Sequence, residues 1–192
     1  HIPTAVLSDF TDIDDLVALR RDINDGREQR VSFQPFFIKA IAAALKEFPL
    51  LNATYDPAKK TITRYDNINI GLAVDTDAGL MVPVLKSVEK KSILQINDEM
   101  RKLVELAQNR TISIDQMRGG TISLTNYGAF GGVYGRPMIL PPQVAILGIG
   151  RIHQKPIVKD GIVTPATVLP VSMPFDHRVI DGAYASRFIT RF

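Results

Sequence analysis

A broad apolar stripe between residues 33 and 48 constrains the fold more than any other pattern in this chain. Its apolar side chains recur at helical spacing, whereas Lys39, Lys46 and Glu47 fall off the stripe. The members of the stripe are Phe33, Phe36, Phe37, Ala40, Ile41, Ala44, Leu45 and Phe48. Pro49 predicts where the helix ends, because proline cannot continue it. So wide an apolar face must be buried against another layer of the protein. The stripe is therefore assigned to the hydrophobic core and implies no cofactor.

The remaining patterns supply that layer. A helix is expected over about 12–24, with aspartates in its first turn, and a second where Ser92 and Gln95 form a capping box. The aspartates, Asp12, Asp14 and Asp15, fit a solvated helix start better than a metal site, and no metal is predicted. Strands are expected at 61–66, 68–74, 80–85, 121–126, 144–149 and 162–173. This mixed order predicts an α+β fold, with helices packed on a mixed sheet, rather than a Rossmann repeat.

Composition narrows the class of protein. The chain has 192 residues, 45% of them hydrophobic, which fits one domain spanning 1–192. It has no 18-residue apolar run and no secretory pattern, so a soluble, cytoplasmic protein is expected. A net charge of +3 without basic clustering argues against nucleic-acid binding. Because the chain has no cysteine, any thiol chemistry must use thiols of the substrates.

Residues 176–182, Asp-His-Arg-Val-Ile-Asp-Gly, hold the chemically most suggestive side chain. Pro174 and Phe175 before this segment, and Asp181-Gly182 at its end, predict a tight non-helical turn that carries His177. A free imidazole has a pKa of ~6.5, which suits proton transfer near neutral pH. His177 is therefore a candidate general base, and the alternative is an ordinary hydrogen-bonded histidine.

Two other segments are assigned structural roles. His153 is expected on a polar surface loop. The glycines of residues 128–132 match no phosphate-binding loop, so a tight connection between strands is expected there.

His-x-x-x-Asp-Gly near a chain end resembles the motif of the coenzyme A-dependent acyltransferases. Within that superfamily, residues 176–183 are similar to the catalytic domain of dihydrolipoyl acyltransferases, the E2 components of 2-oxo acid dehydrogenase complexes. Segments 31–52, 69–86, 119–128 and 136–150 agree in order and spacing, so the resemblance covers nearly the whole chain. It implies a chloramphenicol acetyltransferase-like fold and acyl transfer between the thiols of dihydrolipoamide and coenzyme A.

The resemblance also implies roles for particular residues. His177 is expected to take the proton of the coenzyme A thiol. The hydroxyl of Thr125 is expected to stabilise the tetrahedral oxyanion, with Ser123 on the same strand face as a rival. Asp181 is expected to hold the active-site loop through a buried ion pair, whose partner the sequence does not identify.

Contacts with coenzyme A, the cosubstrate, carry over to six positions. They are Arg20, Ser32, Asp75, Asn126, Gly150 and Ile152. Val104, Ala129 and Pro174 depart from residues common in the family, so a differently shaped coenzyme pocket is expected.

The family further implies an assembly. Its catalytic domains form homotrimers with active sites between subunits, so His177 and Thr125 are expected to come from different chains. Trimers then assemble into a hollow core that works with E1, E3 and lipoyl domains. The lipoyl group sits on a separate domain, and the lipoyl and subunit-binding domains that precede this domain in the family are not among these residues. A mitochondrial matrix location is expected if the source is eukaryotic.

Two alternatives remain open. A free-standing chloramphenicol-type O-acetyltransferase shares the motif, although segments 69–86 and 136–150 favour the dihydrolipoyl family. A non-catalytic scaffold core is disfavoured by the presence of His177 and Thr125. Residues 35–37 and 186–188 resemble branched-chain members, with acetyl as the next candidate for the acyl group and succinyl not excluded.

Overall fold

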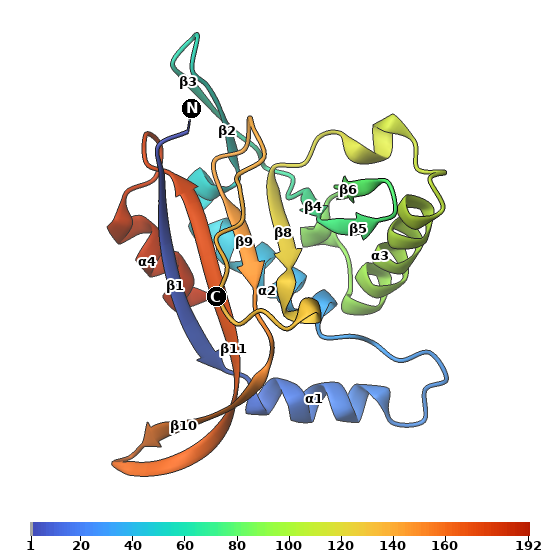
Figure 1. Ribbon diagram of the computed structural model, residues 1–192, viewed down its shortest axis with the longest axis vertical. Helices are drawn as coiled ribbons and strands as arrows, with labels where there is room; N and C mark the ends of the chain where they lie inside the picture. The colour runs from blue at the N-terminus through green and yellow to red at the C-terminus, as the bar shows by residue number, and fades with distance from the viewer. Residues whose placement is uncertain (1) are drawn as a thin grey trace.

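A seven-stranded mixed sheet forms the centre of the computed structural model, which describes residues 2–192 (Figure 1). Its strands, in spatial order, are β1 (Thr4–Asp12), β11 (Ile162–Asp176), β9 (Ile146–Ile149), β8 (Ile122–Asn126), β4 (Ile70–Leu72) and β7 (Val84–Leu85), with β10 (His153–Lys159) paired to β11. Two hairpins stand apart, β2 (Ala53–Asp56) with β3 (Thr61–Arg64) and β5 (Val74–Thr76) with β6 (Gly79–Met81). The predicted α+β class and mixed sheet are confirmed.

Four helices accompany the sheet. They are α1 (Asp14–Asn24), α2 (Gln34–Glu47), α3 (Ile93–Gln108) and α4 (Gly182–Arg191). Short 3-10 turns are η1 (Pro49–Leu51), η2 (Val88–Lys90), η3 (Ile114–Met117) and η4 (Tyr127–Phe130). The predicted stripe is α2, which ends before Pro49, and the predicted capping box of Ser92 and Gln95 opens α3. Among the described helices, none is long and apolar enough to cross a membrane.

The two faces of the sheet differ in character. Leu72, Leu124 and Leu147 lie side by side on neighbouring strands and join the core formed with α2, α3 and α4. The opposite face carries small and polar residues in a row, namely Ser8, Ser172, Gly148 and Thr125. The loop after β8 covers this second face, since Tyr127 and Pro137 pack against Gly148. One sheet therefore has an apolar helix side and a polar loop side.

Some strands differ from the sequence prediction. β1 was not predicted, because Asp9 and Thr11 interrupt the apolar face formed by Ala5 and Leu7; it nevertheless pairs with β11 over nine residues. The expected loop at His153 is wrong, since this half-buried residue begins β10. β11 continues past 173 to Asp176, and its first part projects with β10 as a long hairpin (Figure 1).

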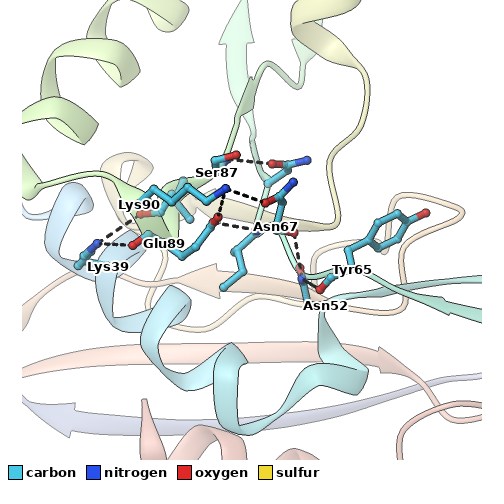
Figure 2. Close-up of polar contacts among 10 residues, drawn as sticks. Lys39, Asn52, Tyr65, Asn67, Ser87, Glu89 and Lys90 are labelled. Atoms are coloured by element: carbon cyan, nitrogen blue, oxygen red, sulfur yellow. Dashed lines mark hydrogen bonds and ion pairs between the residues drawn. The ribbon is translucent and has the colours of Figure 1, made fainter.

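A polar network holds η2 against α2 and β4 (Figure 2). The Lys39 ammonium donates to the backbone carbonyls of Val88, Glu89 and Lys91 at 3.4, 3.2 and 2.5 Å. The Glu89 carboxylate accepts from the backbone N–H of Ile68 at 3.0 Å. The Val88 carbonyl also accepts from the backbone N–H of Lys91 at 3.2 Å, and together these bonds fix the route of the chain between β7 and α3.

Candidate active site

His177 lies on the turn that follows β11 and leads into α4. Its backbone N–H donates to the carbonyl of Pro3 at 2.9 Å, and its ring contacts that of Phe175 at a centroid distance of 5.8 Å. The imidazole side chain is exposed in the single chain. The predicted tight turn is confirmed, and it presents the ring away from the core.

Thr125 lies near the end of β8, half-buried on the polar face of the sheet. It pairs with Gly148 of β9, and Gly148 pairs with Ser172 of β11. The rival hydroxyl, Ser123, is buried and donates to the side-chain carbonyl of Gln143 at 2.7 Å. Thr125 is therefore the hydroxyl on this strand that is better placed to meet a substrate.

One chain does not bring Thr125 and His177 together. β8 runs parallel to β9, and β9 runs antiparallel to β11, so β8 and β11 run in opposite directions and their C-terminal ends point to opposite ends of the strands (Figure 1). His177 follows Ser172, which is level with Thr125, by five residues, or about 17 Å at roughly 3.3 Å a residue. The two side chains cannot touch the same substrate atom within one chain.

Asp181 does not form the predicted ion pair within residues 2–192. Its side chain is exposed and caps α4 by accepting from the backbone N–H of Tyr184 at 2.7 Å. The buried carboxylate of this loop is that of Asp176, which pairs with Arg178. That bond raises the pKa of the Arg178 guanidinium above its ordinary value, since the carboxylate favours the charged form.

A cavity of about 230 Å³ gathers four of the six predicted coenzyme contacts. They are Ser32, Asn126, Gly150 and Ile152. The cavity lies between the N-terminus of α2 and the ends of β8 and β9. The cavity is also lined by Phe33, Gly128 and Arg151. The sequence placed Phe33 in the core stripe and gave no sign that the other two line a cavity.

The other two predicted coenzyme contacts do not line this cavity: Arg20 lies beside it, and Asp75 lies on another element. The Arg20 guanidinium lies 4.3 Å from the centroid of the Phe33 ring and donates to the carbonyl of Val31 at 2.9 Å. It also lines a hollow of about 430 Å³ on α1 and the following loop, whose other charged side chains are those of Arg21, Arg30, Asp22 and Asp25. Asp75 is exposed on the β5–β6 hairpin.

Glycines allow the close approach that shapes the cavity. A Cβ on Gly128 would lie 2.4 Å from the backbone carbonyl of Gly150, and Gly131 has a φ of +91°. The predicted tight connection between strands is wrong: these glycines lie in and after the 3-10 turn η4, which opens a long connection from β8 at Asn126 to β9 at Ile146. The polypeptide can make this wall only where the side chains are absent.

Comparison with known proteins identifies the family. The model of the 2-oxoacid dehydrogenases acyltransferase (catalytic domain) matches residues 1–192. The chain belongs to this family. A curated relative, the dihydrolipoyllysine-residue acetyltransferase component of the pyruvate dehydrogenase complex of Staphylococcus aureus, is 44% identical over 94% of this chain. The match spans only 43% of that relative's length.

Solved structures agree with this family. A dihydrolipoamide acetyltransferase of Azotobacter vinelandii, studied for the roles of a serine, a histidine and an asparagine in catalysis, superimposes with a TM-score of 0.94 at 34% identity. The match covers 100% of this chain and 80% of that one. The cubic core of a pyruvate dehydrogenase multienzyme complex gives the same values. A chloramphenicol acetyltransferase, at 18% identity and a TM-score of 0.62 over 99% of this chain and 86% of its own, shares the fold.

Proposed function

We propose that this chain transfers an acyl group between the thiol of dihydrolipoamide and the thiol of coenzyme A. Membership of the acyltransferase family and the similarity to named acetyltransferases support this reaction. The dihydrolipoyl group is proposed to be carried on a separate domain, as the sequence resemblance implies; the relative's name specifies a dihydrolipoyllysine residue.

The observation that carries the proposal is the spacing of three residues. In the Azotobacter enzyme the serine precedes the histidine by 52 residues, and the asparagine follows the histidine by four. Thr125, His177 and Asp181 have these same intervals. In this chain a hydroxyl therefore stands at the position of the serine and an imidazole at that of the histidine. An aspartate replaces the asparagine.

The proposed chemistry follows from these groups. His177 removes the proton from the coenzyme A thiol, and the thiolate attacks the thioester carbonyl of acyl-dihydrolipoamide. Free thiols and imidazoles differ in pKa by about two units, a gap of roughly 2.7 kcal/mol that a positioned base can bridge. The Thr125 hydroxyl donates to the oxyanion, and one such donor is commonly worth ~3 to 4 kcal/mol. The tetrahedral intermediate collapses to acyl-coenzyme A, and the departing dihydrolipoamide thiolate receives from His177 the proton that came from coenzyme A.

The active site is proposed to lie between two subunits of a homotrimer. The exposure of His177 and its distance from Thr125 within one chain support this proposal, because a second chain would complete the site. Larger assembly into a hollow core with E1 and E3 partners is proposed from the cubic core of a similar complex. A cytoplasmic location, or the matrix of mitochondria, belongs to the same proposal.

Coenzyme A is proposed to enter the cavity between α2, β8 and β9. The N-terminus of α2 borders this cavity and places the partial positive charge of the helix dipole there. The nearby hollow around Arg20 holds three arginines and two aspartates, and its arginines are proposed to contact the phosphates of the coenzyme. Asp75 stays a prediction, with support only from the sequence resemblance.

Acetyl is the acyl group we favour, because the similar proteins are named acetyltransferases. Steady-state kcat/KM for acetyl-, isobutyryl- and succinyl-coenzyme A with dihydrolipoamide ranks the three candidates. A preference for isobutyryl would restore the branched-chain interpretation of residues 35–37 and 186–188.

One experiment tests the proposed function as a whole. Wild type and His177→Ala are compared in acetyl transfer from acetyl-coenzyme A to dihydrolipoamide and, separately, to chloramphenicol. We expect transfer to dihydrolipoamide alone, with kcat lowered at least a hundredfold in His177→Ala. Transfer to chloramphenicol would favour the O-acetyltransferase, and full activity of His177→Ala would favour another catalytic group. An inactive wild type would favour a scaffold core.

A further inference from the structure

The two residues that flank His177 are bonded to each other. Arg178 Nε lies 2.9 and 3.2 Å from the two carboxylate oxygens of Asp176, and Arg178 Nη2 lies 2.6 Å from Oδ2. The backbone N–H of Arg178 also donates to Oδ1 at 3.0 Å. A closed ring of bonds therefore spans His177 from one side to the other.

Neighbouring elements hold this ring in place. The Arg178 guanidinium lies 4.6 Å from the centroid of the Tyr55 ring on β2. This cation–π contact restrains the guanidinium. The backbone N–H groups of Val179 and Ile180 both donate to the Asp176 carbonyl, at 3.0 and 2.9 Å. The main chain on both sides of His177 is thus restrained, while its imidazole stays exposed.

Burial of the Asp176 carboxylate argues for a geometric role. Asp176 is 1% exposed, and its partner Arg178 is about one-third exposed in the side chain. A buried ion pair adds little net stability compared with apolar residues of similar size, because both charges must be desolvated. The pair does fix the relative orientation of the two side chains, because a planar guanidinium bonded to both carboxylate oxygens can adopt few orientations.

We propose that Asp176 and Arg178 form a clamp that positions His177 for acyl transfer, with Tyr55 bracing the arginine. The inference rests on the proposed function, and it gives Asp176 and Arg178 a loop-holding role like the one that the family resemblance implies for Asp181. Asp176 and Arg178 are positioning residues, because they act on the substrate only through His177.

The test compares variants of the assembled protein in dihydrolipoamide acetyltransfer. Arg178→Gln and Asp176→Asn should each lower kcat about tenfold or more, with KM for both substrates within twofold, because His177 is displaced while the binding cavity is untouched. Arg178→Lys keeps the charge and loses the paired contacts, so its kcat should lie between those of Arg178→Gln and wild type. Arg191→Gln, which breaks the exposed pair of Arg191 with Glu47, is the matched control and should keep wild-type kcat.

The double variant Asp176→Leu/Arg178→Met separates positioning from folding. It removes both charges together, so it should fold and assemble, and its kcat should stay low. Wild-type kcat in this variant, or kcat within twofold of wild type in folded Arg178→Gln, would overturn the clamp. A larger change in KM than in kcat would also overturn it.

A crystal structure of Arg178→Gln tests the clamp without relying on the reaction, because it shows the position of the turn directly. We expect residues 177–180 to shift relative to β11, whereas an unchanged turn would refute the clamp. Failure of the proposed function has a different result, namely an inactive wild type or a fully active His177→Ala.

Discussion

Thr125 and His177 lie beyond reach of each other in one chain, because the strands that carry them, β8 and β11, run in opposite directions. Complementation between two inactive variants tests whether they meet across subunits. Thr125→Val and His177→Ala chains, mixed before assembly, should regain activity in about a quarter of the sites of a cyclic trimer. Only an interface with Thr125 from one chain and His177 from its neighbour is then complete.

The control is assembly of each variant alone, which should stay inactive. Steady-state acetyltransfer after co-expression at equal levels gives the recovered fraction. If the mixture is no more active than its parents, the two residues do not share a site across an interface.

Thr125 itself gives a second prediction, since its proposed role needs only a hydroxyl. Thr125→Ser should keep kcat within a few-fold, whereas the isosteric Thr125→Val should lower it by about 10²–10³. Single-turnover acetyl transfer measures the chemical step directly. Equal rates in the serine and valine variants would exclude this hydroxyl as an oxyanion donor.

The sequence predicted most of the apolar framework because helical stripes and strand runs are local patterns. α2 and α3 begin and end close to the positions that Pro49 and Ser92 indicated. β1 escaped prediction because it is a half-buried edge strand whose alternation is interrupted by Asp9 and Thr11. Its pairing with β11 depends on residues more than 150 positions away, which no local pattern records.

The site was predictable only in part. The turn around His177 follows from local proline and Asp-Gly chemistry, but the coenzyme contacts came from family resemblance. Within the described residues of one chain the expected ion pair of Asp181 is absent for a physical reason: β11 extends to Asp176, so this aspartate is buried and Asp181 lies at an exposed helix start. Sequence spacing cannot tell which of two nearby carboxylates enters the core.

Gly128 provides a third prediction, on the wall of the proposed coenzyme cavity. In Gly128→Ala the new Cβ would meet the Gly150 backbone at 2.4 Å, so the free energy of unfolding should fall by about 1–3 kcal/mol. The affinity for coenzyme A should fall with it. Urea unfolding and calorimetric titration measure the two effects.

Gly182→Ala is the control, because a Cβ there meets nothing within 4 Å at the start of α4. It should be neutral or slightly stabilising. Equal stability of the two alanine variants would mean that the Gly128 wall relaxes freely.

The ion pair of Asp12 and Lys159 gives a pH-dependent prediction. The Lys159 side chain, together with the N–H of Asp14, lowers the pKa of Asp12 below its ordinary value. A depressed carboxyl pKa stabilises the fold above the unfolded pKa of about 3.9 and loses that effect as pH falls through the folded pKa. Lys159→Gln should therefore be less stable than wild type at pH 7, with the gap closing below about pH 4. Urea unfolding across pH 3–7 checks this, and a gap independent of pH would mean that the pair does not contribute.

Lys39 offers a prediction about the network of Figure 2, away from the proposed chemistry. Its ammonium donates to the backbone carbonyls of Val88, Glu89 and Lys91. The Val88 carbonyl keeps the N–H of Lys91 as a donor, so Lys39→Met removes this donor chiefly from the other two. Unfolding free energy should fall by about 1–3 kcal/mol, the usual penalty for unsatisfied polar groups. Lys46→Met is the matched control, because Lys46 is exposed on the same helix. Hydrogen exchange should also become faster in residues 88–91 of the Lys39 variant alone, since their carbonyl anchors are lost. Equal stability and equal exchange in the two methionine variants would show that these carbonyls are adequately solvated without the lysine.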